Sequence, residues 1–222
     1  MIKSFLAFFE QHGRLPLWPL WGGETEMMIG YHAVPVIVDA YLKGIGDFDA
    51  EQALNACVVS ADMDSYRGLG LYKKHGYIPY NITYDNSENW SLSKTLEYAY
   101  DDYATALLAK ELGDSENYEK LMKRTDSYKH LFDPSTQFMR GRLKDGTWIT
   151  PFDPKRPFYE YMYREANGWQ STFFAPHDSE GFIALYPSKK AFENKFDSLF
   201  MIPWDGYEAH NLTTFIGQYC HG

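Results

Sequence analysis

The sequence predicts an all-α fold made of antiparallel helix pairs in an inner and an outer layer, with one small β-hairpin. Three observations favour this fold class. Apolar residues recur at helical spacing along most of the chain, mostly apolar segments alternate with amphipathic ones, and long loops precede the apolar segments. No fixed motif repeats every ~30 to 45 residues, so the sequence does not indicate a standard solenoid.

The first helices are expected over residues 2–12, 27–43 and 50–63, where apolar positions follow the helical period. Gly13 is expected to end the first helix as a C-terminal cap. Pro35 should lie in the first turn of the second helix or kink it. The intervening segments contain Pro and Gly and are expected to be loops.

The middle of the chain contains one irregular stretch and two further helices. Residues 64–90 are rich in Gly, Tyr and Asn and are expected to be irregular. Ser91 is expected to cap a helix whose apolar stripe ends at Gly113. Ser115 is expected to cap the next helix, which runs to about Phe132.

A change of period then predicts a β-hairpin. Residues 139–143 and 147–149 flank Lys144-Asp145-Gly146, which is a hairpin turn signal. Residues 151–163 are expected to be a loop. The two short runs that flank this turn predict one small hairpin, and the predicted fold class is all-α.

The C-terminal part is expected to return to helix. Residues 169–174 begin a buried segment, and Asp178 leads into a short helix. Ser188 is expected to cap a last helix over 189–200. Residues 207–213 are expected to be a loop, and 214–219 to be an apolar segment.

Composition and charge exclude several classes of protein. The 222 residues, 45% hydrophobic and 23% charged, are typical of one ordinary globular domain or two small ones. The net charge of −9, with scattered Lys and Arg, argues against nucleic acid as a partner. No apolar run approaches the ~18 residues of a membrane span, and no export signal is recognisable. Cys57 and Cys220 form no metal motif, and both one disulfide and two thiols stay open.

Polar residues gather in loops before predicted helices, where binding sites usually lie. Trp18, Trp21, Glu24 and His32 surround a Gly-rich turn. There the Trp rings can stack on a sugar face while Glu binds hydroxyls; the alternative is a loop with buried Trp and solvated Glu. Aromatic residues reach 18% of the chain, which fits either a heavy core or a sugar-stacking surface.

Two clusters contain carboxylates near helices. Glu97 and Asp101 are four residues apart and share a helix face, so they face a substrate or cation, or are solvated or paired with Lys94. Glu165 stands beside two amides and Trp169, a setting that suits a general acid. The alternative for Glu165 is a cap at a helix start.

His177-Asp178 forms the last cluster, which either binds substrate or is a satisfied surface pair. The zinc motif H-E-x-x-H is absent, as are G-x-G-x-x-G, G-x-x-x-x-G-K-[ST] and G-x-S-x-G. The clusters therefore point to carboxylate chemistry or sugar binding and away from zinc, phosphate-loop and serine-hydrolase chemistry.

Six stretches, in order, resemble glycoside hydrolase family 92, the calcium-dependent exo-acting α-mannosidases. They cover most of the chain and are I-G-Y-H-A-V-P-V-I-V-D-A-Y-L-K-G-I (29–45), S-K-T-L-E-Y-A-Y-D-D-Y (93–103), F-M-R-G-R-L-K-D-G-T-W (138–148), P-F-D-P (151–154), E-A-N-G-W-Q-S-T-F-F-A-P-H-D (165–178) and I-G-Q-Y-C-H-G (216–222).

The resemblance implies an N-terminal β-sandwich followed by an (α/α)6 barrel. Residues 1–222 are expected to be the central part of that barrel, an incomplete (α/α)6 toroid without the sandwich and without the C-terminal end of the barrel. It also implies hydrolysis of terminal α-linked mannose on glycans with inversion, by an acid and a base on opposite sides of the bond, with calcium as cofactor. The parent enzyme is expected to be exported to the periplasm or cell surface.

The resemblance also assigns residues. Glu165 matches the general acid of the family's E-x-N-x-W-Q motif, and Trp169, Gln170, His177 and Asp178 are expected to line or support the pocket. Many relatives read E-G-N-A-W-Q, so Ala166 and Gly168 have exchanged places here, with little effect expected.

Glu24 and His32 match a segment expected to form a sugar-binding wall, with help from Trp18 and, less directly, Trp21. Asp101 and Asp102 match the family's Y-D-D and are expected to be structural.

The family's Asn-Glu-Pro calcium ligands and aspartate base are expected beyond Gly222. The isolated chain is therefore expected to hold the acid but neither the base nor the complete metal site, and to be inactive. The alternative is a remnant that acts as a carbohydrate-binding or interaction module. A third possibility, a trehalase-like helical-barrel hydrolase, would lack the E-A-N-G-W-Q and P-H-D blocks.

Overall fold

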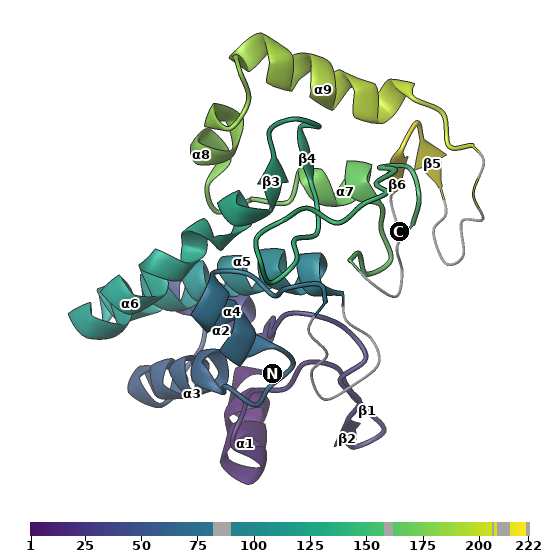
Figure 1. Cartoon of the computed structure of the whole chain (residues 1–222). Helices are drawn as coiled ribbons and strands as arrows, with labels where there is room; N and C mark the ends of the chain where they lie inside the picture. The colour runs from purple at the N-terminus through teal and green to yellow at the C-terminus, as the bar shows by residue number, and fades with distance from the viewer. Residues whose placement is uncertain (82–89, 158–161, 206, 208–213, 221–222) are drawn as a thin grey trace. The chain divides into compact units, whose positions relative to one another are not determined.

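The structure is a computed structural model that describes residues 1–81, 90–157, 162–205, 207 and 214–220. The described residues are mostly helical, and the sheets among them are two-stranded (Figure 1). The predicted all-α class is thus confirmed. No helix of the described residues combines the length and the apolar character needed to cross a membrane.

The chain divides into two units. Unit 1 comprises Met1–Gly76 and Glu97–Ser127, and unit 2 comprises Tyr77–Leu96 and Tyr128–Gly222. The long helix α5 (Ser91–Glu111) contributes its first turns to unit 2 and the remainder to unit 1. Each unit is described by itself.

Unit 1 is a group of helices with one short hairpin. Its elements are α1 (Ile2–His12), β1 (Pro19–Leu20), β2 (Gly23–Glu24), α2 (Ala33–Leu42), α3 (Ala50–Asp62), α4 (Leu69–His75), most of α5, and α6 (Ser115–Thr125). Helix α1 packs against α2 and α3, and α3 also packs against α4 (Figure 1). Val34, Ile37 and Cys57 are fully buried among them.

Local chemistry explains most of these boundaries. Gly13 ends α1 at a φ of 74°, and its N–H donates to the Phe9 carbonyl at 2.7 Å, as predicted. Pro35 lies in the first turn of α2, where its missing N–H costs nothing. The Asp49 carboxylate caps α3 by accepting the Gln52 N–H at 2.9 Å.

Four predicted boundaries in unit 1 and α5 were wrong. Helix α2 begins at Ala33 and not at residue 27. Helix α4 lies inside the segment expected to be irregular, because Leu69 and Tyr72 are buried although glycines surround them. The cap of α6 is Asp114 and not Ser115, and Ser91 is the first helical residue of α5.

Unit 2 contains shorter elements. They are the start of α5, β3 (Phe132–Asp133), β4 (Phe138–Met139), α7 (Gly168–Thr172), α8 (Ser179–Ala184), α9 (Lys189–Met201), β5 (Phe215–Ile216) and β6 (Tyr219–Cys220). A 3-10 helix, η1 (Asp126–Leu131), leads into this unit and replaces the last part of the helix expected to run to Phe132. Its core gathers Leu92, Tyr128 and Met139, which are fully buried.

The predicted hairpin over 139–149 is only partly formed. Phe138 and Met139 pair with β3 instead, while the turn at 144–146 is closed by an isolated bridge between Arg142 and Trp148. The last predicted helix is confirmed as α9, capped by Ser188. The loop predicted over 207–213 lies almost entirely outside the described residues, and 214–219 falls largely in the β5–β6 hairpin.

The cysteines lie in different units. Cys57 is a buried thiol on α3, and Cys220 is a partly exposed thiol at the end of β6. Of the two states that the sequence left open, the structure has two thiols.

Candidate active site

His32 joins two clusters that the sequence analysis treated as separate. It lies just before α2, and its ring nitrogens meet both carboxylates that share one face of α5. Nδ1 is 2.7 Å from Asp101 Oδ1, and Nε2 is 2.8 Å from Glu97 Oε2. The His32 ring is therefore a partner of the Glu97–Asp101 pair that the sequence analysis did not name beside substrate, cation, solvent and Lys94.

The backbone around His32 is shaped for this contact. The Tyr31 N–H donates to Asp101 Oδ2 at 2.7 Å, so one carboxylate holds two consecutive residues. Gly30 has a φ of 76°, and a Cβ there would lie 2.5 Å from His32 Nε2. Only glycine fits both the backbone conformation and the closeness of the ring.

Electrostatics keep the His32 ring protonated. Burial by itself lowers the pKa of His32. The carboxylates of Asp101 and Glu97 raise it by more than burial lowers it, and the resulting pKa is about 10. Burial likewise raises the pKa of Glu97, and His32 offsets part of that shift. At neutral pH the ring is an imidazolium that donates both N–H groups.

Asp102 has a structural position, as expected. Its buried carboxylate accepts the hydroxyl groups of Tyr31 at 2.6 Å and Tyr72 at 3.0 Å, and Arg124 Nε lies 3.0 Å away. Burial raises the pKa of Asp102 to about 6, although Arg124 and the hydroxyls oppose that shift. Arg124 and Tyr72 carry no motif that the sequence analysis could use.

The β1–β2 hairpin presents two tryptophans and an inward carboxylate. Trp18 is 44% exposed, and Trp21, at a φ of 56°, is fully exposed. The Glu24 carboxylate accepts four backbone N–H groups of its own loop at 2.6 to 2.9 Å, from Leu17, Trp18, Thr25 and Glu26. This reverses the alternative of buried Trp and solvated Glu.

Glu24 consequently has little spare hydrogen-bonding capacity. Burial raises its pKa, and the backbone donors together with Arg14 lower it more, so the pKa of Glu24 is below its usual value. The carboxylate organises the hairpin that carries Trp18. Its predicted contact with sugar hydroxyls stays a prediction.

In unit 2, Glu165 stands on a constrained backbone. Its φ is 49°, a conformation that non-glycine residues seldom adopt and that often marks a functional position. Its side chain is 37% exposed, and Arg164 Nη2 lies 3.3 Å from Oε1. The backbone N–H of Arg164 donates to Ser93 Oγ at 2.9 Å, and the Arg164 guanidinium stacks over the Trp90 ring. These two contacts anchor the residue before Glu165.

Helix α7 follows Glu165 after Ala166 and Asn167, and it begins with a complete capping box. The Asn167 side chain accepts the Gln170 N–H, and the Gln170 side chain accepts the Asn167 N–H at 2.9 Å. Asn167 and not Glu165 is therefore the cap, which removes the alternative reading of Glu165. A Cβ on Gly168 would meet Pro154 at 3.0 to 3.1 Å, so the exchange of Ala166 and Gly168 suits a close contact with that loop.

Trp169 and Gln170 face the interior of unit 2. Trp169 is 6% exposed and packs edge-on against Phe138, with ring centroids 4.8 Å apart. The Gln170 Nε2 group donates to the Gln218 carbonyl at 2.9 Å. Their predicted role in lining or supporting the pocket stays a prediction.

His177 and Asp178 also have structural partners. Asp178 caps α8 by accepting the Gly181 N–H, and it accepts the Tyr128 hydroxyl at 2.8 Å. Lys129 Nζ lies 3.3 Å from the same carboxylate, and these contacts lower the pKa of Asp178 although burial raises it. The His177 ring packs edge-on against Tyr128. Of the predicted pocket residues in unit 2, the two carboxylate side chains, Glu165 and Asp178, are 37% and 33% exposed.

The described residues contain no group of three or more His, Cys, Asp and Glu side chains placed to hold a metal ion. Asp101, Glu97 and His32 come closest in composition, but the imidazolium occupies the space between the two carboxylates. We therefore assign no calcium ligand among the described residues.

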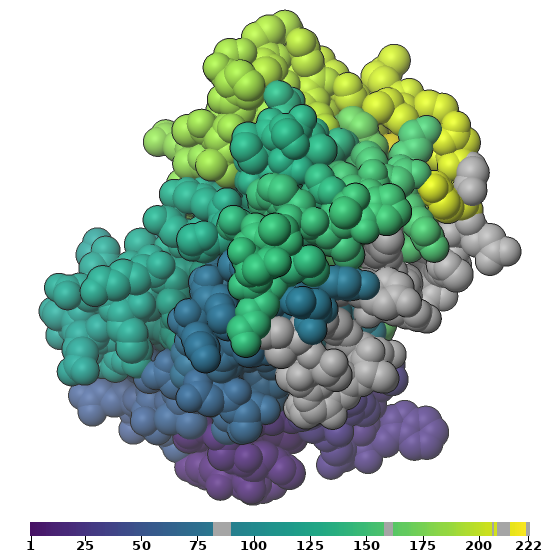
Figure 2. Space-filling model, viewed as in Figure 1, coloured from purple at the N-terminus to yellow at the C-terminus, as the bar shows by residue number. Residues whose placement is uncertain are grey.

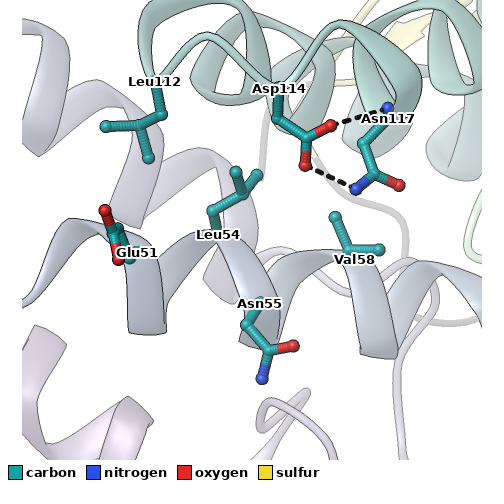
Figure 3. A pocket seen from close by; sticks show the side chains of 7 residues that line it. All are labelled: Glu51, Leu54, Asn55, Val58, Leu112, Asp114 and Asn117. Atoms are coloured by element: carbon teal, nitrogen blue, oxygen red, sulfur yellow. Dashed lines mark hydrogen bonds between the residues drawn. The ribbon is translucent and has the colours of Figure 1, made fainter.

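A groove of about 320 Å³ lies elsewhere in unit 1 (Figure 3). It is lined by α3, the end of α5 and the start of α6, through Glu51, Leu54, Asn55, Val58, Leu112, Asp114 and Asn117. None of the predicted site residues lines it. The Asp114 and Asn117 side chains bond each other across its wall, which fits their capping role at α6.

Comparison with known proteins shows the family to which the chain is similar. The sequence profile of the glycosyl hydrolase family 92 catalytic domain matches residues 1–222. A family GH92 α-mannosidase from Bacteroides thetaiotaomicron, solved in complex with mannoimidazole, is 37% identical and superposes with a TM-score of 0.89 over 100% of this chain and 30% of that one.

Two further relatives agree. A family GH92 inverting mannosidase from the same organism is 29% identical, with a TM-score of 0.79 over 93% of this chain and 28% of its own. A protein from Arthroderma benhamiae, described as an uncharacterized secreted glycosidase, is 31% identical over 225 residues, 86% of this chain and 29% of its own length. The chain thus spans about 30% of the relatives it matches. The predicted resemblance is confirmed: the chain belongs to glycosyl hydrolase family 92.

Proposed function

We propose that the chain supplies the general acid of an inverting exo-α-mannosidase, with Glu165 as the proton donor for terminal α-linked mannose on glycans. The observation that carries this proposal is the Glu165 side chain itself. Its backbone is held in the left-handed region, its carboxyl is partly exposed, and rigid elements flank it on both sides. A carboxyl that must reach a substrate needs both fixed position and access.

The chemistry follows from the position of the leaving group. Glu165 would protonate the glycosidic oxygen as the bond to the anomeric carbon breaks, so that the aglycone leaves as a neutral alcohol. A water would attack the anomeric carbon from the opposite face with help from a base, which inverts the configuration. We assign the base to none of the described residues. Similarity to a family GH92 α-mannosidase and to a family GH92 inverting mannosidase supports the choice of mannose.

Glu165→Gln in the full protein tests the acid role. A glutamine keeps the size of the side chain but cannot donate the proton. The rate on a mannosyl disaccharide should fall by about 100-fold or more, while an aryl α-mannoside with an acidic phenol should lose far less, because its leaving group needs little protonation.

Glu180→Gln is the matched control, since Glu180 is exposed on α8 of the same unit. It should leave both rates unchanged. Equal losses on the two substrates in Glu165→Gln would contradict the acid role. The anomer released first, followed by NMR, reports inversion separately from the acid.

The exposed Trp18 and Trp21 favour a second candidate function, sugar binding without hydrolysis. Aromatic faces presented on a braced hairpin can stack on a pyranose ring. This candidate would be favoured over the enzyme by two results together. The protein would bind mannose oligosaccharides without releasing mannose, and Trp18→Ala and Trp21→Ala would abolish the binding.

Calcium and export complete the proposal. Calcium dependence rests on the family resemblance, and loss of mannose release on chelation, restored by added calcium, would support it. The relative described as secreted supports export of the whole protein. Activity confined to the cytoplasmic fraction would contradict export.

A further inference from the structure

Gln218 lies at the centre of a buried amide network in unit 2. The residue is fully buried in the turn between β5 and β6. Its Oε1 atom accepts the Asn167 Nδ2 group at 2.9 Å, and its Nε2 group donates to the Pro203 carbonyl at 2.7 Å. Its own carbonyl accepts the Gln170 Nε2 group at 2.9 Å.

These bonds attach Gln218 to the capping box of α7. Asn167, also fully buried, donates its second amide hydrogen to the Lys155 carbonyl at 3.1 Å and accepts the Gln170 N–H. The Gln170 Oε1 atom accepts the Asn167 N–H, and its Nε2 group donates to the Gln218 backbone carbonyl. Gln218 therefore contacts both residues of the box, Asn167 through its side-chain amide and Gln170 through its backbone carbonyl.

The turn that carries Gln218 is itself fixed on α9. The Gln218 N–H donates to the Leu199 carbonyl at 2.7 Å near the end of that helix. Gly217 has a φ of 61°, and a Cβ there would lie 2.4 Å from the Phe200 carbonyl carbon, so the backbone contact requires glycine. The surface of α9 passes directly into that of β5 and β6 (Figure 2).

We propose that Gln218 is a positioning residue for the proton donor Glu165. It connects the end of α9 to the capped start of α7, and Glu165 stands two residues before the Asn167 cap. The inference rests on the proposed function of Glu165 and extends it to a residue some 50 positions later in the sequence. Gln218 does not need to touch substrate for this role.

The physical reason is the geometry that acid catalysis demands. The carboxyl must stand within hydrogen-bond distance of the glycosidic oxygen, and a displacement of about 1 Å can cost about 100-fold in rate. Glu165 has an unfavourable backbone conformation that persists only if its surroundings impose it. Removing the Gln218 amide leaves Asn167 Nδ2 and the Pro203 carbonyl without that partner and loosens the restraint.

Gln218→Met in the full protein tests the inference, because methionine has similar length and no amide. Amide hydrogen exchange over residues 165–172 should accelerate. The disaccharide rate should fall by about 10- to 100-fold, and the rate on the aryl α-mannoside with an acidic phenol should fall much less, which is the pattern expected of Glu165→Gln. Gln52→Met, at a partly exposed position of α3 in unit 1, is the control and should change neither readout.

Gln218→Asn is the second variant and covers the case in which the methionine variant does not fold. It retains an amide one methylene short, and it should give the same pattern with a smaller loss. Unchanged exchange over 165–172, or equal loss on both substrates, would overturn the role of Gln218. If Glu165→Gln itself lacks the leaving-group pattern, the proposed function fails; if only the Gln218 variants lack it, the inference alone fails.

Discussion

Two partly buried cations, one in each unit, have opposite environments. In unit 1, the His32 ring lies between the carboxylates of Glu97 and Asp101, at 2.8 and 2.7 Å. In unit 2, Lys195 Nζ lies 3.1 Å from the centroid of the Phe138 ring and 4.6 Å from that of Trp169. No carboxylate among the described residues pairs with Lys195.

The difference shows what a buried charge needs. Burial lowers the pKa of both groups, but in His32 the two carboxylates overcome it and raise the pKa to about 10. The aromatic faces and the Thr136 carbonyl, which lies 3.3 Å from Lys195 Nζ, do not overcome the effect of burial. The pKa of Lys195 is therefore lowered to about 8. Two carboxylates thus hold the charge of His32 in unit 1, whereas in unit 2 the charge of Lys195 has only aromatic faces and one carbonyl beside it among the described contacts.

The largest effect is expected from breaking the ionic cluster at Asp101. Asp101→Ala removes the acceptor of the buried Tyr31 N–H and one partner of His32, and should lower the free energy of unfolding by about 3 kcal/mol. Asp101→Asn keeps an acceptor and should cost about half as much.

Asp39→Ala is the control, at an exposed residue paired with Lys43. It should change the free energy of unfolding by under about 0.5 kcal/mol in the same urea titrations. Equal, small losses in both Asp101 variants would show that the cluster does not stabilise unit 1.

A smaller effect is expected from the charge on His32 alone. The folded-state pKa of about 10 exceeds the ordinary value of 6.5, so the folded protein binds more protons between these values. The stabilisation is complete below pH 6.5 and is lost as the pH rises toward 10. His32→Gln should cost about 1 kcal/mol at pH 6, because partial exposure screens the pair, and should flatten this fall.

Urea unfolding at a series of pH values measures this slope. His12→Gln is the control, since His12 is exposed and stacks on Phe8. An unchanged slope in His32→Gln would mean that the ring carries no extra proton in the folded protein. It would remove the contrast with Lys195.

Local signals accounted for much of the fold. Helices α1, α3 and α9 follow from apolar spacing with Gly13, Asp49 and Ser188 at their ends, because caps and periodicity act within a few residues. Helix α4 was missed because its helical character comes from the burial of Leu69 and Tyr72, which local composition does not reveal. Tertiary burial overrode propensity there.

The candidate site was predictable as residues but not as contacts. The motifs singled out Glu165, His32 and the Glu97–Asp101 pair. That His32 lies between those two carboxylates depends on a pairing some 65 positions apart, which one sequence does not reveal. The sequence analysis gave no role to Gln218 within the I-G-Q-Y-C-H-G stretch. The role of a side-chain amide depends on its buried hydrogen-bond partners, which the sequence does not show.

The smallest effect is expected at Lys195, where the sign of the pH dependence is opposite. The folded-state pKa of about 8 lies below the ordinary 10.5, so the folded protein binds fewer protons between these values and gains stability as the pH rises through that range. Lys195→Met should abolish that rise. At pH 7 it should change the free energy of unfolding by under about 1 kcal/mol, because the lost cation–π contact offsets the relieved burial of charge. Lys190→Met, at an exposed residue of α9 paired with Glu193, should retain the rise. If the His32→Gln and His32→Gln/Lys195→Met variants showed the same pH dependence between pH 8 and 10.5, the pKa of Lys195 would not be lowered, and the aromatic faces would hold its charge as well as the two carboxylates hold that of His32.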